Sequence, residues 1–281
     1  MNSSKFSMDY IYTINMKIAL KAIILVAGIG SRLRPLTENK PKCLVEFGGK
    51  TILERLQKNF FDCGITDITL VVGYEKNQLN IKNFNVIENH EYNNSGIMHS
   101  LYNAKEKFTD DIIISYGDII FEKEILEKLI ESKENITAVI DKEWEKYWKI
   151  RTDDPLSDAE SLIIDKNNYV LNIGEKNLKE IKDVAGQFIG LIKFQNDGVK
   201  HLKEFFEQLY KKNLEKNIPI YGNIPFKQST LTNFLQIMIE NNHKIKACFI
   251  ENGWLEFDTV DDYNLYNEMY DKKILSKFIK I

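Results

Sequence analysis

The chain has few cysteines, and their spacing predicts neither a disulfide framework nor a metal site. Its 281 residues include three cysteines, Cys43, Cys63 and Cys248, which lie far apart in the sequence. An odd number of widely spaced cysteines is typical of reduced thiols that pack in the protein interior. We therefore expect a cytoplasmic protein whose fold depends on a hydrophobic core rather than on disulfide bonds.

Long hydrophobic runs and a strong charge of either sign are also absent. The apolar segment that begins at Ile18 is interrupted by Lys21 and is soon followed by the charged, glycine-bearing stretch Gly28–Arg32. It therefore predicts a buried strand rather than a signal peptide. No run approaches the roughly 20 apolar residues that span a membrane. The formal net charge of −3 offers no basic footprint for nucleic acid, so we expect neither a membrane nor a nucleic-acid partner.

What the chain does contain is an alternation of short β-branched runs with amphipathic segments. The runs predict strands at 21–27, 68–72, 85–89, 112–116, 136–140, 186–194 and 246–250. The amphipathic segments predict one helix that is capped by Thr51 and ended by Gly64. Further helices are expected at 100–108, 123–132, 199–212 and 231–241.

This alternation predicts an α/β fold. Up to residue 140 it favours a Rossmann-like three-layer sandwich, in which helices cover both faces of a mostly parallel mixed sheet. From Asp141 onward the alternation weakens, which predicts a small additional subdomain. Residues 1–20 show no clear pattern and are expected to form an N-terminal arm, whereas 21–270 form one domain with two halves, 21–140 and 141–270.

A glycine-rich turn follows the first predicted strand. It runs from Ala27 to Arg32 and leads on to Pro41 and Lys42. Glycines in such a turn let backbone N–H groups approach phosphates, and two fixed cations stand beside it. The turn has neither the third glycine and acidic ribose partner of a dinucleotide-binding loop nor the Gly-Lys-Ser/Thr of a P-loop, which disfavours a nicotinamide-dependent oxidoreductase. A tight turn without a ligand is the alternative.

The stretch from Lys21 to Lys42 resembles the signature of the sugar-nucleotidyltransferase-like family, roughly A-G-x-G-[ST]-R-L-x-P-x-T-x-x-x-P-K. Val26 stands where the family usually has a second alanine. The resemblance implies that Arg32 and Lys42 are catalytic residues that hold the triphosphate and the attacking phosphate. It also implies nucleotide contacts from the loop residues Val26, Ala27, Gly28, Gly30, Ser31 and Arg32.

Two acidic residues match the metal ligands of that family. Asp118 follows a hydrophobic strand in Tyr116-Gly117-Asp118, and open α/β sheets place ligands at the carboxyl ends of strands. Asp258 belongs to the segment Gly253–Asp262, which resembles the family's W-x-[DE]-[IV]-[DN]-T-x-x-D motif. The resemblance implies that Asp118, also catalytic, and Asp258 bind Mg²⁺, a cation that prefers oxygen ligands and substrate phosphates. A turn aspartate and an acidic helix start, the latter expected for Asp261 and Asp262, are the alternatives.

A polar stretch in the middle of the first half, Asn93-Asn94-Ser95-Gly96 with Ser100-Leu101, resembles one that family cytidylyltransferases carry near the base and ribose. It implies that Asn94, Ser95 and Ser100 contact the nucleotide. An Asn-Gly-rich turn followed by a helix cap is an equally weighted alternative.

The stretch from Asp141 to Glu160, with Gly174–Lys176 and Gly186–Gly190, resembles cytidylyltransferases that activate small amino-bearing phosphates and phosphonates, such as phosphocholine, 2-aminoethylphosphonate and phosphoglutamine. Asn177 replaces a proline that follows the Glu-Lys pair in sugar-phosphate enzymes, which puts sugar recognition in doubt.

Several residues of these segments are candidate acceptor ligands. Arg151 and Lys176 could neutralise the acceptor phosphate, and Asp158 or Glu160 could pair with its amine. Trp144 and Trp148 could face a cation, an attraction worth about 0.5–2 kcal/mol, or could simply pack in the core. The expected acceptor-binding set is Trp144, Trp148, Arg151, Asp158, Glu160, Lys176 and Gln187.

The resemblance implies a Mg²⁺-dependent cytidylyltransferase that transfers CMP from CTP to a small amino-bearing phosphate or phosphonate and releases pyrophosphate, for bacterial surface polysaccharide or phosphonate decoration. Residues 21–140 would then form the nucleotide-binding half and 141–270 the acceptor-side half. A sugar-1-phosphate nucleotidyltransferase that uses UTP or dTTP, and a non-catalytic nucleotide-binding regulator of the same fold, are the alternatives. Association as a homodimer is left open.

Overall fold

A seven-stranded mixed sheet forms the centre of the protein. The computed structural model describes residues 20–176, 178, 180–216, 219 and 221–281. Across the sheet the strand order is β12-β8-β11-β6-β1-β4-β5. All neighbouring pairs are parallel except the two made by β11, which runs antiparallel to both β6 and β8. The strands are β1 (Lys21–Val26), β4 (Ile68–Val72), β5 (Asn85–Glu88), β6 (Ile112–Tyr116), β8 (Ile136–Asp141), β11 (Gln187–Phe194) and β12 (Lys246–Ile250).

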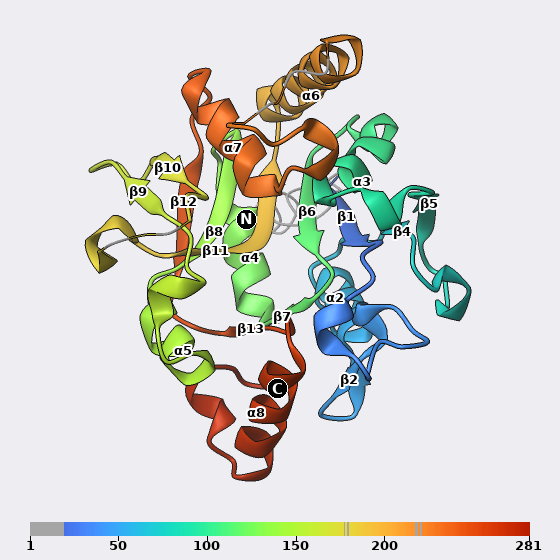
Figure 1. Cartoon of the computed structure of the whole chain (residues 1–281), viewed down its shortest axis with the longest axis vertical. Coiled ribbons are helices and arrows are strands. Elements are labelled where there is room, and N and C mark those ends of the chain that lie inside the picture. Colours follow the sequence, from blue (N-terminus) through green and yellow to red (C-terminus); the bar gives the residue numbers. More distant parts are fainter. Residues whose placement is uncertain (1–19, 177, 179, 217–218, 220) are drawn as a thin grey trace, which may run out of the picture.

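Helices cover both faces of this sheet, because β1 carries apolar side chains on both of its faces. Ala22, Ile24 and Val26 face one hydrophobic core, while Ile23 and Leu25 face the other, because successive side chains of a strand point to opposite faces. The first core contains α2 (Ile52–Asp62), α4 (Lys123–Glu131), α5 (Trp144–Arg151) and α8 (Val260–Asp271). The second contains α3 (Ile97–Asn103), α6 (Asp197–Lys216) and α7 (Leu231–Glu240). Figure 1 shows α6 and α7 at the top of the view and α5 and α8 at the bottom. The predicted three-layer α/β fold is confirmed.

Local signals explain where the helices start. Thr51 caps α2, as predicted from the sequence, and it also forms a reciprocal capping box with Glu54. Helix α8 starts in the same way, with Thr259 and Asp262. The expected helix at 100–108 instead begins at Ile97, because Gly96 supplies the extended N-cap, and it ends at Asn103. Ser100 therefore lies inside the helix rather than at its cap.

Several short elements were not predicted. They are α5, the hairpin of β9 (Leu162–Ile164) and β10 (Val170–Ile173), and the pair formed by β7 (Ile119–Phe121) and β13 (Trp254–Glu256). Each strand is at most four residues long, too short for a hydrophobic period to be recognised. A further hairpin joins β2 (Glu46–Phe47) to β3 (Lys50–Thr51).

The sheet is continuous across the two expected halves, since β11 and β12 of the second half pair with β6 and β8 of the first. The division at residue 140 stays a prediction about function. The expected N-terminal arm and Asn177 lie outside the described residues, apart from Leu20. Among the helices that the structure describes, none has the length and apolar character needed to cross a membrane.

Candidate active site

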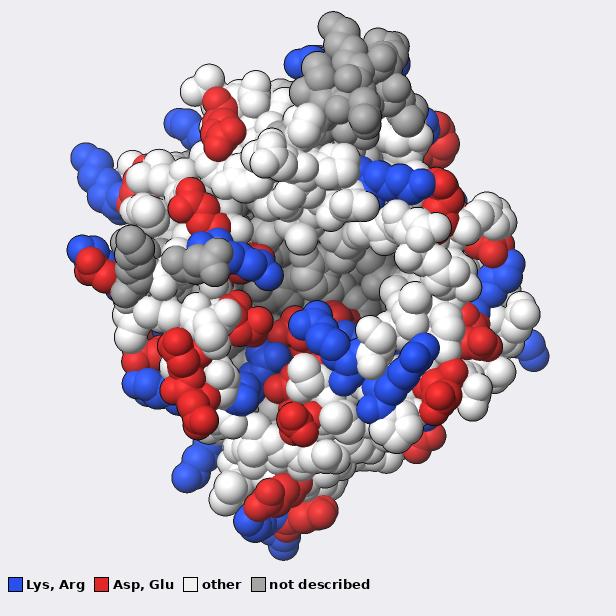
Figure 2. Space-filling model, viewed as in Figure 1, with Lys and Arg blue, Asp and Glu red and all other residues white. Residues whose placement is uncertain are grey.

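A cavity of about 410 Å³ lies at the carboxyl ends of β1 and β6. The ends of β1 and β6, the glycine-rich turn that follows β1 and the start of α3 all line it. Figure 2 shows this face of the molecule hollowed near its middle, with charged side chains crowded along the lower rim of the hollow. The position agrees with the rule that open α/β sheets bind ligands beyond the carboxyl ends of their strands.

Two glycines shape the lining of the cavity. Gly30 has φ of 65°, and its carbonyl accepts a hydrogen bond from the buried Thr37 Oγ1 at 2.7 Å. A Cβ atom on Gly30 would lie 3.2 Å from Lys42 Cβ, so the glycine lets the turn close against Lys42. A Cβ atom on Gly117 would lie 2.3 Å from Val26 Cγ1 and 2.6 Å from the Leu25 carbonyl oxygen. The two strand ends can touch only because Gly117 has no side chain.

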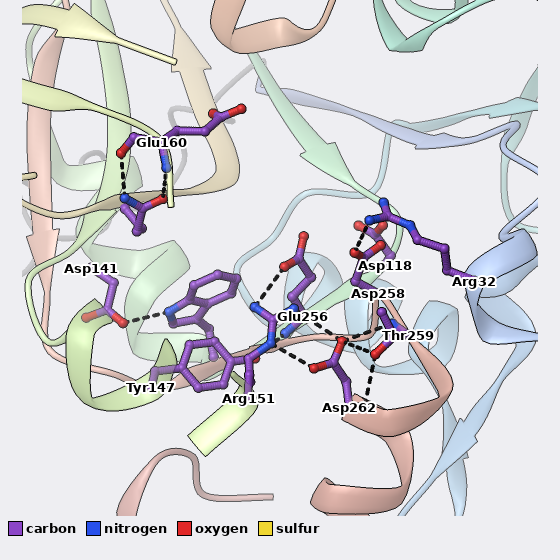
Figure 3. A network of polar contacts seen from close by, with 12 residues as sticks. Arg32, Asp118, Asp141, Tyr147, Arg151, Glu160, Glu256, Asp258, Thr259 and Asp262 are labelled. Carbon is purple, nitrogen blue, oxygen red and sulfur yellow. Dashed lines mark hydrogen bonds and ion pairs between the residues drawn. The ribbon is translucent and has the colours of Figure 1, made fainter. Parts of the chain in front are cut away.

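Four charged side chains meet at the rim of this cavity. Lys42 Nζ lies 3.1 Å from Asp118 Oδ2 and 3.3 Å from Asp258 Oδ1. Arg32 Nη1 lies 2.7 Å from Asp258 Oδ2, and its side chain is largely exposed. Figure 3 shows Arg32 pointing toward Asp118 and Asp258. Burial disfavours the Lys42 ammonium, but the charges of Asp118 and Asp258 outweigh burial and hold the pKa of Lys42 above its ordinary value. Residues that are far apart in the chain thus form one cluster, which we call the charged cluster.

The β7–β13 pair brings the two aspartates of the charged cluster together. Asp118 immediately precedes β7, and Asp258 lies just beyond the end of β13. Glu256 pairs with Ile119 in the ladder, and Phe257 N donates to the Asp118 carbonyl oxygen at 2.8 Å. The spacing of the two carboxylates is therefore set by backbone hydrogen bonds rather than by long loops.

Glu256 is a site residue that the sequence reasoning missed. It lines the cavity beside Asp118 and Asp258, and 26% of its side chain is exposed. Burial raises the pKa of Glu256 to about 7, although the nearby Arg151 opposes this and the charges of Asp118 and Asp258 add to it. The sequence feature that could have identified Glu256 is its position two residues before Asp258, because alternate residues of an extended segment point to the same side.

A buried polar network fixes both the side chain and the main chain of Glu256. Arg151 Nη1 lies 3.1 Å from Glu256 Oε2, and Arg151 Nε lies 2.8 Å from Asp262 Oδ1. The Glu256 main chain is fixed at both ends, since its N–H donates to Tyr147 Oη at 2.9 Å and its carbonyl accepts from Tyr266 Oη at 3.0 Å. Figure 3 shows Arg151 between Glu256 and Asp262.

A second cavity of about 220 Å³ adjoins the first. The predicted acceptor ligands Trp148, Asp158, Glu160, Lys176 and Gln187 all line it. The two cavities share part of their wall, namely Arg32, Tyr116, Thr230, Glu256 and Asp258. Two ligands could therefore meet beside the charged cluster.

Hydrogen bonds and charge arrange the wall of this second cavity. Two hydrogen bonds join the Gln187 side chain to the Glu160 backbone. Gln187 Oε1 accepts from the Glu160 N–H at 3.2 Å, and Gln187 Nε2 donates to the Glu160 carbonyl oxygen at 2.7 Å. Lys176 Nζ lies 3.9 Å from Glu160 Oε1. Burial raises the pKa of Glu160, and Lys176 opposes that rise. The wall therefore carries charges of both signs.

Three predicted ligands do not line either cavity. Asn94 is exposed outside the first cavity, whereas Ser95 and Ser100 line it. Trp144 is 3% exposed and packs against Trp148 within the first core. Arg151 is 6% exposed and is held by carboxylates. Direct acceptor contacts by Trp144 and Arg151, and a nucleotide contact by Asn94, stay predictions that this geometry does not favour.

The charged cluster offers the oxygen ligands that Mg²⁺ takes. In the described part of the chain, no three His, Cys, Asp or Glu side chains are arranged to hold a metal by themselves. However, the carboxylates of Asp118 and Asp258 converge on one cation, the Lys42 ammonium. Mg²⁺ is commonly bound through one or two carboxylates, substrate phosphates and water, so this donor set fits.

The close approach at Gly117 leads to a first prediction. We expect Gly117→Ala to reduce the free energy of unfolding by about 1–3 kcal/mol, because the new methyl group must push the β1 and β6 ends apart. Activity should fall as well, since Asp118 follows directly. Urea unfolding and turnover would measure both effects. Gly28→Ala is the stability control, because nothing lies within 4 Å of a Cβ atom there. Wild-type stability and turnover in Gly117→Ala would contradict the packing argument.

Residues 22–171 match the family described as MobA-like NTP transferase domain. The chain is 36% identical over 262 residues to the CTP:phosphoglutamine cytidylyltransferase of Campylobacter jejuni, covering 89% of this chain and 100% of that protein. It is 37% identical over 106 residues to the choline-phosphate cytidylyltransferase of Streptococcus pneumoniae, covering 36% of this chain and 46% of that protein.

Among solved structures, the fold is similar to that of the CTP:phosphocholine cytidylyltransferase LicC of Streptococcus pneumoniae, with a TM-score of 0.68 and 22% sequence identity. The superposition covers 89% of this chain and 99% of that chain. The resemblance predicted from the sequence motifs is thus confirmed. The chain belongs to the family of MobA-like NTP transferase domains, and it is a nucleotidyltransferase.

Proposed function

We propose that this protein transfers CMP from CTP to a small amino-bearing phosphate or phosphonate and releases pyrophosphate, with Mg²⁺ as cofactor. The observation that carries the proposal is the meeting of two cavities at the charged cluster. A nucleotide in the first cavity and an acceptor in the second would face each other there. The similarity to a phosphoglutamine cytidylyltransferase over nearly the whole chain supports CTP and this acceptor class.

The reaction needs positioning and charge neutralisation rather than a general base. An ionised oxygen of the acceptor attacks the α-phosphorus in line, a new P–O bond forms, and the bond to the β-phosphate oxygen breaks as pyrophosphate leaves. Arg32 and Lys42 stabilise the negative charge that develops on pyrophosphate. Asp118 and Asp258 would hold Mg²⁺, which when bound neutralises the phosphate oxygens.

The second cavity matches an acceptor that carries both charges. Asp158 and Glu160 are carboxylates suited to an amine, whereas Lys176 and Arg32 suit a phosphate or phosphonate. Trp148 supplies an aromatic wall. Among the three candidates, phosphoglutamine is favoured by the full-length relative. We further propose that the enzyme works in the cytoplasm, where CTP is made, and that its product serves surface polysaccharide or phosphonate decoration.

The test is pyrophosphate release with Mg²⁺, in which CTP, UTP, dTTP, ATP and GTP are crossed with a panel of acceptors. The panel contains phosphoglutamine, phosphocholine, 2-aminoethylphosphonate, glucose-1-phosphate and a control without acceptor. We expect release only with CTP and one amino-bearing acceptor. Release with UTP or dTTP and glucose-1-phosphate would overturn the proposal in favour of the sugar-1-phosphate enzyme. No release with any pair would contradict the proposed substrates.

A further inference from the structure

The nucleotide cavity has a charged end and an uncharged end, which come from opposite faces of the sheet. Arg32 and Lys42 lie on turns whose neighbours Leu33 and Cys43 belong to the core around α2. Ser100 lies on α3, which packs in the core on the other face. With the triphosphate at Arg32 and Lys42, as the proposed function requires, the nucleobase reaches the α3 end. The inference below rests on that proposed function.

A buried asparagine fixes the direction of hydrogen bonding at the α3 end. Asn89 is fully buried at the end of β5, and its Oδ1 accepts from the Glu91 backbone N–H at 2.9 Å. That contact identifies the other side of the amide as its NH₂ group, which has two hydrogens and no lone pair to offer. Asn89 Nδ2 donates one hydrogen to Ser95 Oγ and the other to Ser100 Oγ, both at 2.9 Å.

The two serines therefore differ in what remains for a ligand. Ser95 Oγ donates its hydroxyl hydrogen to the Glu91 carbonyl oxygen at 2.8 Å, so that hydrogen is already used. Ser100 accepts from Asn89, and the described residues record no acceptor for its own hydrogen. Because Ser100 also lines the cavity, its O–H is available to donate to a ligand bound there.

We propose that Asn89 is a positioning residue, which holds the Ser100 hydroxyl as a hydrogen-bond donor toward the polar edge of the nucleobase. Cytosine presents two acceptors on that edge, N3 and O2. Uracil presents an N–H group in place of the N3 acceptor. A hydroxyl held as a donor therefore fits cytosine at either position and fits uracil at only one.

The test reverses the direction of this hydrogen bond. In Asn89→Asp the carboxylate has no hydrogen, so it must accept from Ser100, whose lone pairs then face the base. We expect the Kd of CTP, measured by calorimetry without acceptor, to rise about 10- to 100-fold. Ser100→Ala, which buries no new charge, should raise the Kd by a similar factor. The double variant should bind no more weakly than Ser100→Ala, because both changes act on one contact.

Asn83→Asp is the matched control, since it adds the same charge to an exposed position of the same segment. A Kd within twofold of wild type in either Asn89→Asp or Ser100→Ala would overturn the inference, as would additive losses in the double variant. If the wild type does not bind CTP, the proposed function fails instead. The same series is then titrated with the nucleotide that the wild type does bind, and the same outcomes decide the role of Asn89.

Discussion

Asp118→Asn is expected to lose at least about 100-fold in turnover while the protein stays folded. Asp118 contacts Lys42 and lines the first cavity, so its charge is needed for the cation that neutralises the phosphates. Asparagine has nearly the same shape, and a quarter of the Asp118 side chain is exposed. Lys42 keeps Asp258 as its partner, which leaves no unpaired buried charge.

The measurement is pyrophosphate release at saturating Mg²⁺, with melting temperature as the check on folding. Asp261→Asn is the control, because Asp261 carries the same charge on an exposed position close to Asp258 and should retain wild-type turnover. Undiminished turnover in Asp118→Asn at saturating Mg²⁺ would rule out Asp118 as a metal ligand. Loss of turnover together with a higher Mg²⁺ concentration at half-maximal turnover would support it.

Arg151→Met is expected to cost about 3–5 kcal/mol of unfolding free energy, the largest effect on stability that we predict. Only 6% of the Arg151 side chain is exposed, and it forms ion pairs with Asp262 and Glu256. Methionine preserves much of the side-chain volume but leaves both carboxylates without their cation. Denaturant unfolding measures the loss.

Two further variants make this result specific. Lys149→Met removes a cation of the same helix whose ion pair with Glu145 is exposed, and it should barely change stability. In Arg151→Met/Asp262→Asn one of the two carboxylates left without a cation is neutralised. The double variant should therefore lose less unfolding free energy than the two single variants lose together. If Arg151→Met were as stable as the wild type but raised the KM for the acceptor, the direct acceptor contact expected from the sequence would be favoured.

The sequence predicts those parts of the site that depend on local geometry. Gly28, Arg32 and Lys42 surround a single turn, and Asp118 ends a recognisable strand, so their meeting at one sheet edge follows from the parallel topology. Glu256 and Arg151 could not be placed in this way. Their contact depends on the pairing of two three-residue strands and on the packing of α5 against α8, which have no periodic signal.

The tryptophans illustrate the same limit. Trp144 and Trp148 are one helical turn apart on α5, so they share a face. The sequence does not say how far that face extends into the core. In the structure both are buried, and only Trp148 reaches the wall of a cavity.

The short ladder between β7 and β13 has a consequence for how such enzymes diversify. It fixes the two aspartates relative to each other with main-chain bonds, which are insensitive to the identity of most side chains around them. The segments that supply Asp158, Lys176 and Gln187 lie outside this ladder. New acceptor preferences could therefore arise, or be grafted in the laboratory, by exchanging those segments while the bond-making apparatus is inherited unchanged.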